Sequence, residues 1–156
     1  MSDADARGRP LLVMFLCNHC PFVKHIRHEV AALARHYQPK GVAVAAISAN
    51  DPVLYPDDAP ERMVAEACDV GYSFPYLFDA SQAVARAFDA QCTPDIFLYD
   101  ANHRLVYRGQ LDDSRPKSEI PVTGRDLRAA LDAVLAGRAP LPEQRPSIGC
   151  SIKWRA

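Results

Sequence analysis

A Cys-Asn-His-Cys motif at residues 17–20 separates two apolar segments of different periodicity. Residues 11–16 form an uninterrupted apolar run with the length of a buried strand. After the motif, apolar side chains recur at helical spacing as far as Tyr37. The chain therefore passes from a buried strand into an amphipathic helix at the two cysteines, and this junction restricts both the fold and the chemistry.

The position of the motif favours a reactive sulfur atom. Amide N–H groups and the macrodipole stabilise an anion at a helix N-terminus, and the thiolate is the form of cysteine that reacts. We predict that the helix spans about residues 20–36 and that the Cys17 sulfur lies at its N-terminus with a lowered pKa. We also expect Cys17 to be more exposed than Cys20.

The following segments predict three further strands. Gly41 precedes a second apolar run at residues 42–47, and strands that are apolar throughout are typical of parallel sheets covered on both faces. Residues 96–99 and 105–107 flank a short polar turn and predict a β-hairpin. Together with the first strand, they predict a four-stranded mixed sheet.

The remaining segments place helices around this sheet. Residues 61–68 have the pattern of a short helix within an insertion between the two pairs of strands. Thr123 and Asp126 have the spacing of a capping box and predict the start of a last helix, which Gly137 can end.

This order of elements predicts an α/β fold with the thioredoxin architecture. A central mixed β-sheet is flanked by helices, and a helical insertion separates the βαβ and ββα halves. We expect residues 1–156 to form a single domain, with residues 138–156 as an extended C-terminal tail.

The composition is that of an ordinary globular domain. The chain has 156 residues, of which 49% are apolar and 24% charged, and its formal net charge is −1. This charge gives no reason to expect nucleic acid or a membrane surface as a partner. The acidic N-terminus is followed by a short apolar run that is too brief for a signal peptide or a membrane span, so we expect a cytoplasmic location.

The five cysteines do not have the pattern of a disulfide scaffold or a metal site. Cys17, His19 and Cys20 lack the paired ligand spacing of structural zinc, and no second Cys-x-x-Cys is present. Pro21 stands where the covalent haem motif requires histidine. We therefore expect no metal or other cofactor, and we interpret the close cysteine pair as catalytic.

Several separate motifs, in order, resemble one group of redox proteins. The chain is similar, from residue 10 to its end, to redoxins usually labelled peroxiredoxin-like or thioredoxin-like, in the broad group of the alkyl hydroperoxide reductase and thiol-specific antioxidant proteins. The matching motifs lie at residues 15–24, 48–51, 92–95, 107–116 and 146–154. In the thioredoxin superfamily a cis-proline faces the Cys-x-x-Cys motif, and Pro94 matches that position.

The resemblance implies a role for each residue of the motif. Cys17 is the expected nucleophile, and Cys20 would resolve the mixed disulfide. His19 is either a redox-tuning group that stabilises the Cys17 thiolate or a solvated side chain. Thr93 and Pro94 would form the substrate-facing loop, where the backbone before the proline can pair with an extended peptide.

Two further cysteines are candidates for additional redox thiols. Cys92 should lie near the motif, and we favour its alternative role as a small core residue. Cys150 can return to the site as a resolving thiol, although packing of a tail anchored by Trp154 is a simpler explanation.

The chain lacks helper residues of the related families. Thioredoxins carry a buried Asp six residues before the first cysteine, where this chain has Leu11. Peroxiredoxins carry Thr three residues before their reactive cysteine, where this chain has Met14. Their arginine also has no evident equivalent near Thr93, and the position of Arg108 relative to Cys17 does not follow from the sequence.

The sequence therefore predicts a thiol–disulfide oxidoreductase that uses Cys17 and Cys20. The alternatives are a thiol-dependent peroxidase and a non-enzymatic redox sensor or thiol-dependent binding module. The expected partners are a protein or small-molecule disulfide or a peroxide as substrate, and a thiol reductant such as thioredoxin or glutathione. The oligomeric state does not follow from the sequence.

Overall fold

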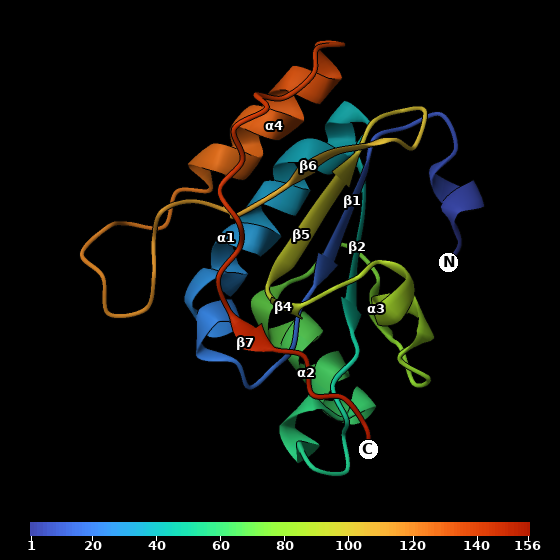
Figure 1. Ribbon diagram of the computed structural model, residues 1–156, viewed down its shortest axis with the longest axis vertical. Coiled ribbons are helices and arrows are strands. Elements are labelled where there is room, and N and C mark those ends of the chain that lie inside the picture. The colour runs from blue at the N-terminus through green and yellow to red at the C-terminus, as the bar shows by residue number, and fades with distance from the viewer.

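The first apolar run forms the central strand of a five-stranded mixed sheet with the order β3-β2-β1-β5-β6 (Figure 1). The computed structural model describes residues 1–156. The strands are β1 (Leu11–Phe15), β2 (Ala43–Ser48), β3 (Tyr76–Phe78), β4 (Cys92–Thr93), β5 (Asp95–Tyr99), β6 (Leu105–Arg108) and β7 (Cys150–Ser151). The α-helices are α1 (Pro21–Tyr37), α2 (Pro60–Val70), α3 (Ala83–Ala87) and α4 (Arg125–Leu135). Short 3-10 helices span Asp3–Ala6 (η1), Gln38–Lys40 (η2) and Pro56–Asp58 (η3).

β1 is central because both of its faces are apolar. It pairs in parallel with β2 and antiparallel with β5. Leu12 and Met14 point into the larger hydrophobic cluster, whereas Val13 and Phe15 point into the smaller one. Alternate residues of a strand face opposite sides of a sheet, so an unbroken apolar run requires cover on both sides.

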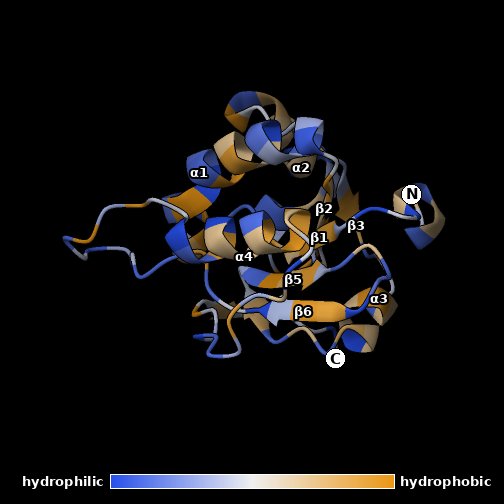
Figure 2. Ribbon diagram, turned by 90° about the horizontal axis from the view of Figure 1, so that it is seen from above, coloured by the Kyte–Doolittle hydropathy of each residue, from blue (hydrophilic) through white to orange (hydrophobic).

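Helices supply that cover on each side (Figure 2). The larger cluster contains Val30 and Leu33 of α1 and Leu127 and Leu131 of α4. The smaller cluster contains Ala85 of α3 on the opposite face. The predicted α/β architecture, with a βαβ half, a helical insertion and a ββα half, is confirmed.

The prediction of four strands is wrong, because the insertion contributes a fifth. β3 pairs in parallel with β2, with Ala46 opposite Tyr76. Only three residues make up this strand. A segment of that length shows too little alternation to reveal a pairing partner from sequence.

The start of α4 also differs from its prediction. Gly124 is the N-cap residue, with a left-handed φ of 71°, and the predicted capping box of Thr123 and Asp126 does not form. Instead, the backbone N–H groups of Thr123 and Gly124 each donate to one oxygen of Asp112 at 2.7 Å. The buried carboxylate therefore fixes the two residues that lead into the helix, and the Leu111 carbonyl accepts from the first-turn N–H groups of Asp126 and Leu127.

The C-terminal tail returns along the molecule to the lower end of the sheet, where β7 pairs antiparallel with β4 (Figure 1). Ile152 is 4% exposed and packs into the smaller cluster. The backbone N–H of Lys153 donates to Asn50 at 2.9 Å. Ile152 rather than Trp154 therefore anchors the tail, because Trp154 is 37% exposed with Arg86 stacked on its ring. None of the helices combines the length and the apolar character needed to cross a membrane.

Candidate active site

The Cys-Asn-His-Cys motif forms the loop between β1 and α1, and Cys20 is the N-cap residue of the helix. Its backbone is extended, with φ −67° and ψ 125°, and Pro21 occupies the first helical position. A residue before proline is driven out of the helical region by steric clash, so Cys20 cannot join the helix. The prediction that the Cys17 sulfur lies at the helix N-terminus is therefore wrong, because Cys20 holds that position.

Both thiols of the motif are buried. Cys17 is 1% exposed and Cys20 is 0% exposed, so the expected greater exposure of Cys17 is not observed. Both side chains belong to the larger hydrophobic cluster. The segments around Asp58 and Thr93, which converge on the motif, contribute to this burial.

Thr93 contacts both cysteines of the motif. Its hydroxyl lies 3.3 Å from the Cys17 sulfur, and the Cys20 thiol donates to its backbone carbonyl at 3.3 Å. The Thr93–Pro94 peptide bond is cis. The fold thus brings together two motifs that are far apart in the sequence.

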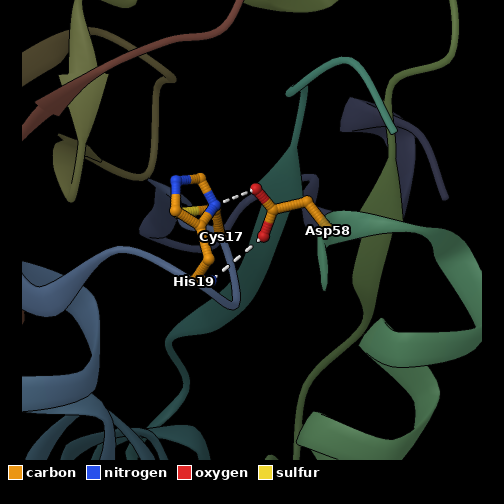
Figure 3. Close-up of side chains that lie close together, drawn as sticks. All are labelled: Cys17, His19 and Asp58. Atoms are coloured by element: carbon orange, nitrogen blue, oxygen red, sulfur yellow. Dashed lines mark hydrogen bonds and ion pairs between the residues drawn. The ribbon is translucent and has the colours of Figure 1, made fainter. Parts of the chain in front are cut away.

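Asp58 is the residue that the sequence analysis missed. It lies at the end of η3 and is 0% exposed. One of its oxygens accepts hydrogen bonds from the backbone N–H groups of Asn18 at 2.7 Å and His19 at 3.1 Å. The other accepts from the Asn50 amide at 2.9 Å and contacts His19 Nδ1 (Figure 3). Four contacts therefore fix the buried carboxylate to the motif and its surroundings.

The sequence held little signal for this role. Asp58 was visible only as part of a Pro-Asp-Asp turn, and it lies 38 positions after the second cysteine of the motif. Spacing arguments detect groups on one element, whereas this contact depends on how the η3 loop folds back over the motif.

His19 is held in one orientation and is not a freely solvated side chain. Its ring stacks on Tyr55, with 5.4 Å between ring centroids and 16° between planes. Its side chain is 24% exposed. One potential ligand atom from each of Cys17, His19 and Asp58 lies within 4.8 Å of the other two (Figure 3).

This cluster contains atom types that can bind zinc. One Asp58 oxygen accepts hydrogen bonds from the backbone of the motif loop. The other accepts from the Asn50 amide and contacts Nδ1 of His19. These hydrogen bonds account for the proximity of His19 and Asp58 without a metal ion.

The environment drives the pKa values of the two thiols apart. A hydrogen bond to Cys20, burial and the charge of Asp58 all raise the pKa of Cys17, and the hydroxyl of Thr93 partly opposes them. The pKa of Cys20 is lowered, first by the Cys17 thiol that donates to it, and also by Cys150 and the backbone N–H of Val23. The opposite shifts indicate that the two sulfurs titrate as one coupled pair.

The two further candidate thiols lie on opposite sides of the small β4–β7 sheet. Cys150 is opposite Thr93, and Cys92 is opposite Ser151. Because side chains alternate along a strand, Cys150 shares the Thr93 side that faces the motif, and Cys92 points away from it. Cys92 is half-buried, donates to the Pro94 carbonyl at 3.4 Å and belongs to neither hydrophobic cluster, so its interpretation as a core residue is wrong.

Arg108 does not serve Cys17. Its guanidinium donates to Asp95 at 3.1 Å and to the Asp89 carbonyl at 2.8 Å. It also lies over the ring of Phe97, 4.5 Å from the centroid. The carboxylate of Asp58, rather than an arginine, is the charged side chain that acts most strongly on Cys17.

Solved structures similar to this chain fall into two groups. An uncharacterized conserved protein from Geobacillus kaustophilus is 57% identical, with a TM-score of 0.93 over 95% of this chain and 78% of that chain. A hypothetical protein from Sinorhizobium meliloti 1021 is 52% identical, with a TM-score of 0.96 over 99% of this chain and 84% of that chain. A thiol-disulfide isomerase from Corynebacterium glutamicum is 21% identical, with a TM-score of 0.69 over 87% of this chain and 86% of that chain. At this identity the likeness shows the fold alone.

A comparison with curated proteins found no match. The model of the AhpC/TSA family matches residues 1–108, which include β1 to β6 and both cysteines of the motif. This match covers more than half of the chain, and it agrees with the thioredoxin-like sheet and the buried cysteine pair. The chain therefore belongs to the AhpC/TSA family of redoxins.

Proposed function

We propose that this redoxin is a thiol–disulfide oxidoreductase in which Cys17 and Cys20 cycle between a dithiol and a disulfide. The observation that supports this proposal is that both thiols contact one residue, Thr93. Cys20 also lies at the start of α1. The opposite pKa shifts of the two cysteines agree with a pair that shares a proton.

The exchange begins when Cys17 loses its proton to solvent, while Cys20 stays a thiol that donates to the Thr93 carbonyl. The Cys17 thiolate attacks a substrate disulfide, and one substrate sulfur leaves as a thiolate. That leaving group takes the proton from Cys20. Cys20 then attacks the Cys17 sulfur, which closes the Cys17–Cys20 disulfide and releases the second substrate sulfur. The pair loses two electrons, and the substrate disulfide gains them.

Asp58 and His19 act as positioning residues in this scheme. Asp58 binds the two backbone N–H groups between the cysteines and so fixes the conformation of the loop. Its charge favours the thiol form of Cys17, whereas the helix N-terminus favours the thiolate form of Cys20. Groups that stabilise the reduced pair make its disulfide a stronger oxidant.

Single cysteine variants test this proposal with oxidised glutathione and insulin as substrates and dithiothreitol as the electron donor. We expect Cys17→Ser to abolish turnover of both substrates. Cys20→Ser should trap a mixed disulfide at Cys17, because the resolving thiol is missing. Cys68→Ser is the matched control, since Cys68 is exposed on α2 and should retain full turnover. Full turnover by Cys17→Ser would contradict the proposal.

The peroxidase alternative makes a separate prediction. An acidic group beside Cys17 disfavours its thiolate, and Arg108 is bound by Asp95 and is not available to a peroxide. We therefore expect hydrogen peroxide to oxidise Cys17 no faster than an ordinary thiolate, measured by stopped flow. A much faster rate would favour the peroxidase. A disulfide that forms but that no thiol reductant turns over would favour the redox sensor.

A further inference from the structure

The backbone beside Pro94 is already occupied by a strand of the same chain. β7 pairs with β4, so the edge that an extended peptide was expected to use carries the tail instead. Gly149 packs directly on Thr93, because a Cβ atom at this position would lie 2.0 Å from the Thr93 carbonyl oxygen. The tail therefore lies in close contact with the residue that contacts both motif thiols.

This pairing places a third thiol at the site. Cys150 stands opposite Thr93 in the register of the two strands and packs against the hydrophobic cluster that contains Cys20. Cys150 is also one of the groups that lower the pKa of Cys20, which agrees with this placement. Cys20 therefore has one possible sulfur partner within the motif, Cys17, and a second on the tail.

The three thiols differ in their access to solvent. Cys17 and Cys20 are buried, at 1% and 0% exposed, whereas Cys150 is half-buried. A thiol reductant that approaches the folded protein therefore meets Cys150 before either cysteine of the motif.

We propose that Cys150 is a third redox thiol that exchanges with the Cys17–Cys20 disulfide and passes electrons to it from a thiol reductant. This inference rests on the proposed function, because it requires the motif disulfide to form first.

The exchange is an isomerisation of one disulfide within the protein. The Cys150 thiolate attacks the Cys20 sulfur, the bond between Cys17 and Cys20 breaks, and Cys17 leaves as a thiolate. Cys17 takes up a proton in place of the one that Cys150 gave up, so no external oxidant is needed. A thiol reductant then attacks the Cys150 sulfur, the Cys20–Cys150 bond breaks, and Cys20 leaves as a thiolate that takes up the reductant's proton. A second reductant thiol attacks the reductant sulfur of the mixed disulfide, so Cys150 leaves as a thiolate that takes up a proton, and the two reductant molecules end as a disulfide.

Disulfide mapping tests this proposal, because trypsin separates the relevant cysteines. Cys17 and Cys20 share the peptide 8–24, Cys150 lies on 139–153, and Cys92 lies on 87–104. We expect the Cys17→Ser variant, equilibrated in an oxidising glutathione buffer and then alkylated, to give peptide 8–24 linked to 139–153. Oxidised wild-type protein should give both this linked pair and the internal Cys17–Cys20 disulfide.

Two controls separate this inference from the proposed function. In the Cys17→Ser background, Cys92→Ser should leave the linked peptide intact, because Cys92 faces away from the motif, and Cys150→Ser should eliminate it. Cys150→Ser alone should still form the Cys17–Cys20 disulfide but should lose turnover with the thiol reductant. Absence of the linked peptide from the Cys17→Ser variant would overturn the role of Cys150 and leave the Cys17–Cys20 pair unaffected.

Discussion

Replacing Asp58 with asparagine removes a buried negative charge beside Cys17 and retains an oxygen that can accept hydrogen bonds from the loop. The reacting sulfur and the carboxylate lie within 4.8 Å of each other. Two unit charges at that distance interact by about 3.5 kcal/mol at an effective dielectric constant of about 20. That energy corresponds to about 2.5 pKa units. Asp58→Asn should therefore lower the pKa of Cys17 by roughly 1 to 2.5 units. The lower end applies because the groups that donate hydrogen bonds to the carboxylate reduce the effect of its charge on Cys17.

The assay uses a Cys20→Ser background, so that Cys17 titrates without its partner thiol. The rate of iodoacetamide labelling at Cys17 is followed against pH by mass spectrometry of the tryptic peptide 8–24. Asp57→Asn is the matched control, because Asp57 is the adjacent residue, carries the same charge and is exposed. It should leave the pKa of Cys17 within a few tenths of a unit, on the order of what screened surface charges produce. A Cys17 pKa that is unchanged or raised by Asp58→Asn would refute the electrostatic role of Asp58.

Three other substitutions test separate parts of the structure. Thr93→Val removes a hydroxyl that lowers the pKa of Cys17, so the same labelling assay should show a rise of about 1 unit, the worth of one hydrogen bond to a charged group. Gly149→Ala should displace the tail, because its Cβ would overlap a backbone oxygen of β4, and should speed labelling of both motif thiols. Ile148→Ala is its control, since that side chain is 53% exposed, and equal labelling in the two variants would contradict this reasoning. Asp112→Ala should cost about 2–4 kcal/mol of unfolding free energy in urea titrations, because it leaves the N–H groups of Thr123 and Gly124 without their acceptor. Although burial opposes its charge, the hydrogen bonds hold the pKa of Asp112 below its usual range, so this stabilisation is fully present above about pH 3.9 and is lost as the pH falls through the lower folded value. A difference in unfolding free energy between wild type and Asp112→Ala that did not shrink in acid would argue against this role of the carboxylate.

The sequence was sufficient for the elements whose pattern is long and local. β1 and β2 are continuous apolar runs, and α1 has an apolar face over 17 residues, so periodicity alone identified them. The position of Pro94 in the order of elements was enough to predict that Thr93 lies beside the motif.

The features that were missed depend on contacts between distant segments. Asp58 reaches His19 from a turn with no helical or strand period. β3 has three residues and β7 has two, so neither is long enough to show an alternation of apolar and polar residues. The position of Cys20, rather than Cys17, at the N-terminus of α1 is a local feature. The extended backbone that Pro21 imposes on Cys20 could have predicted it from the sequence.

The most direct test of the central claim is a redox titration of the Cys17–Cys20 pair in defined thiol–disulfide buffers, with trapped thiols counted on peptide 8–24. We expect both cysteines to be oxidised together in one two-electron transition, which disappears in Cys20→Ser. A midpoint near about −270 mV would indicate a reductase, and one near about −120 mV an oxidant. If Cys17 and Cys20 stay reduced in the oxidising buffers, or are oxidised without forming a disulfide between them, the proposed dithiol mechanism is wrong.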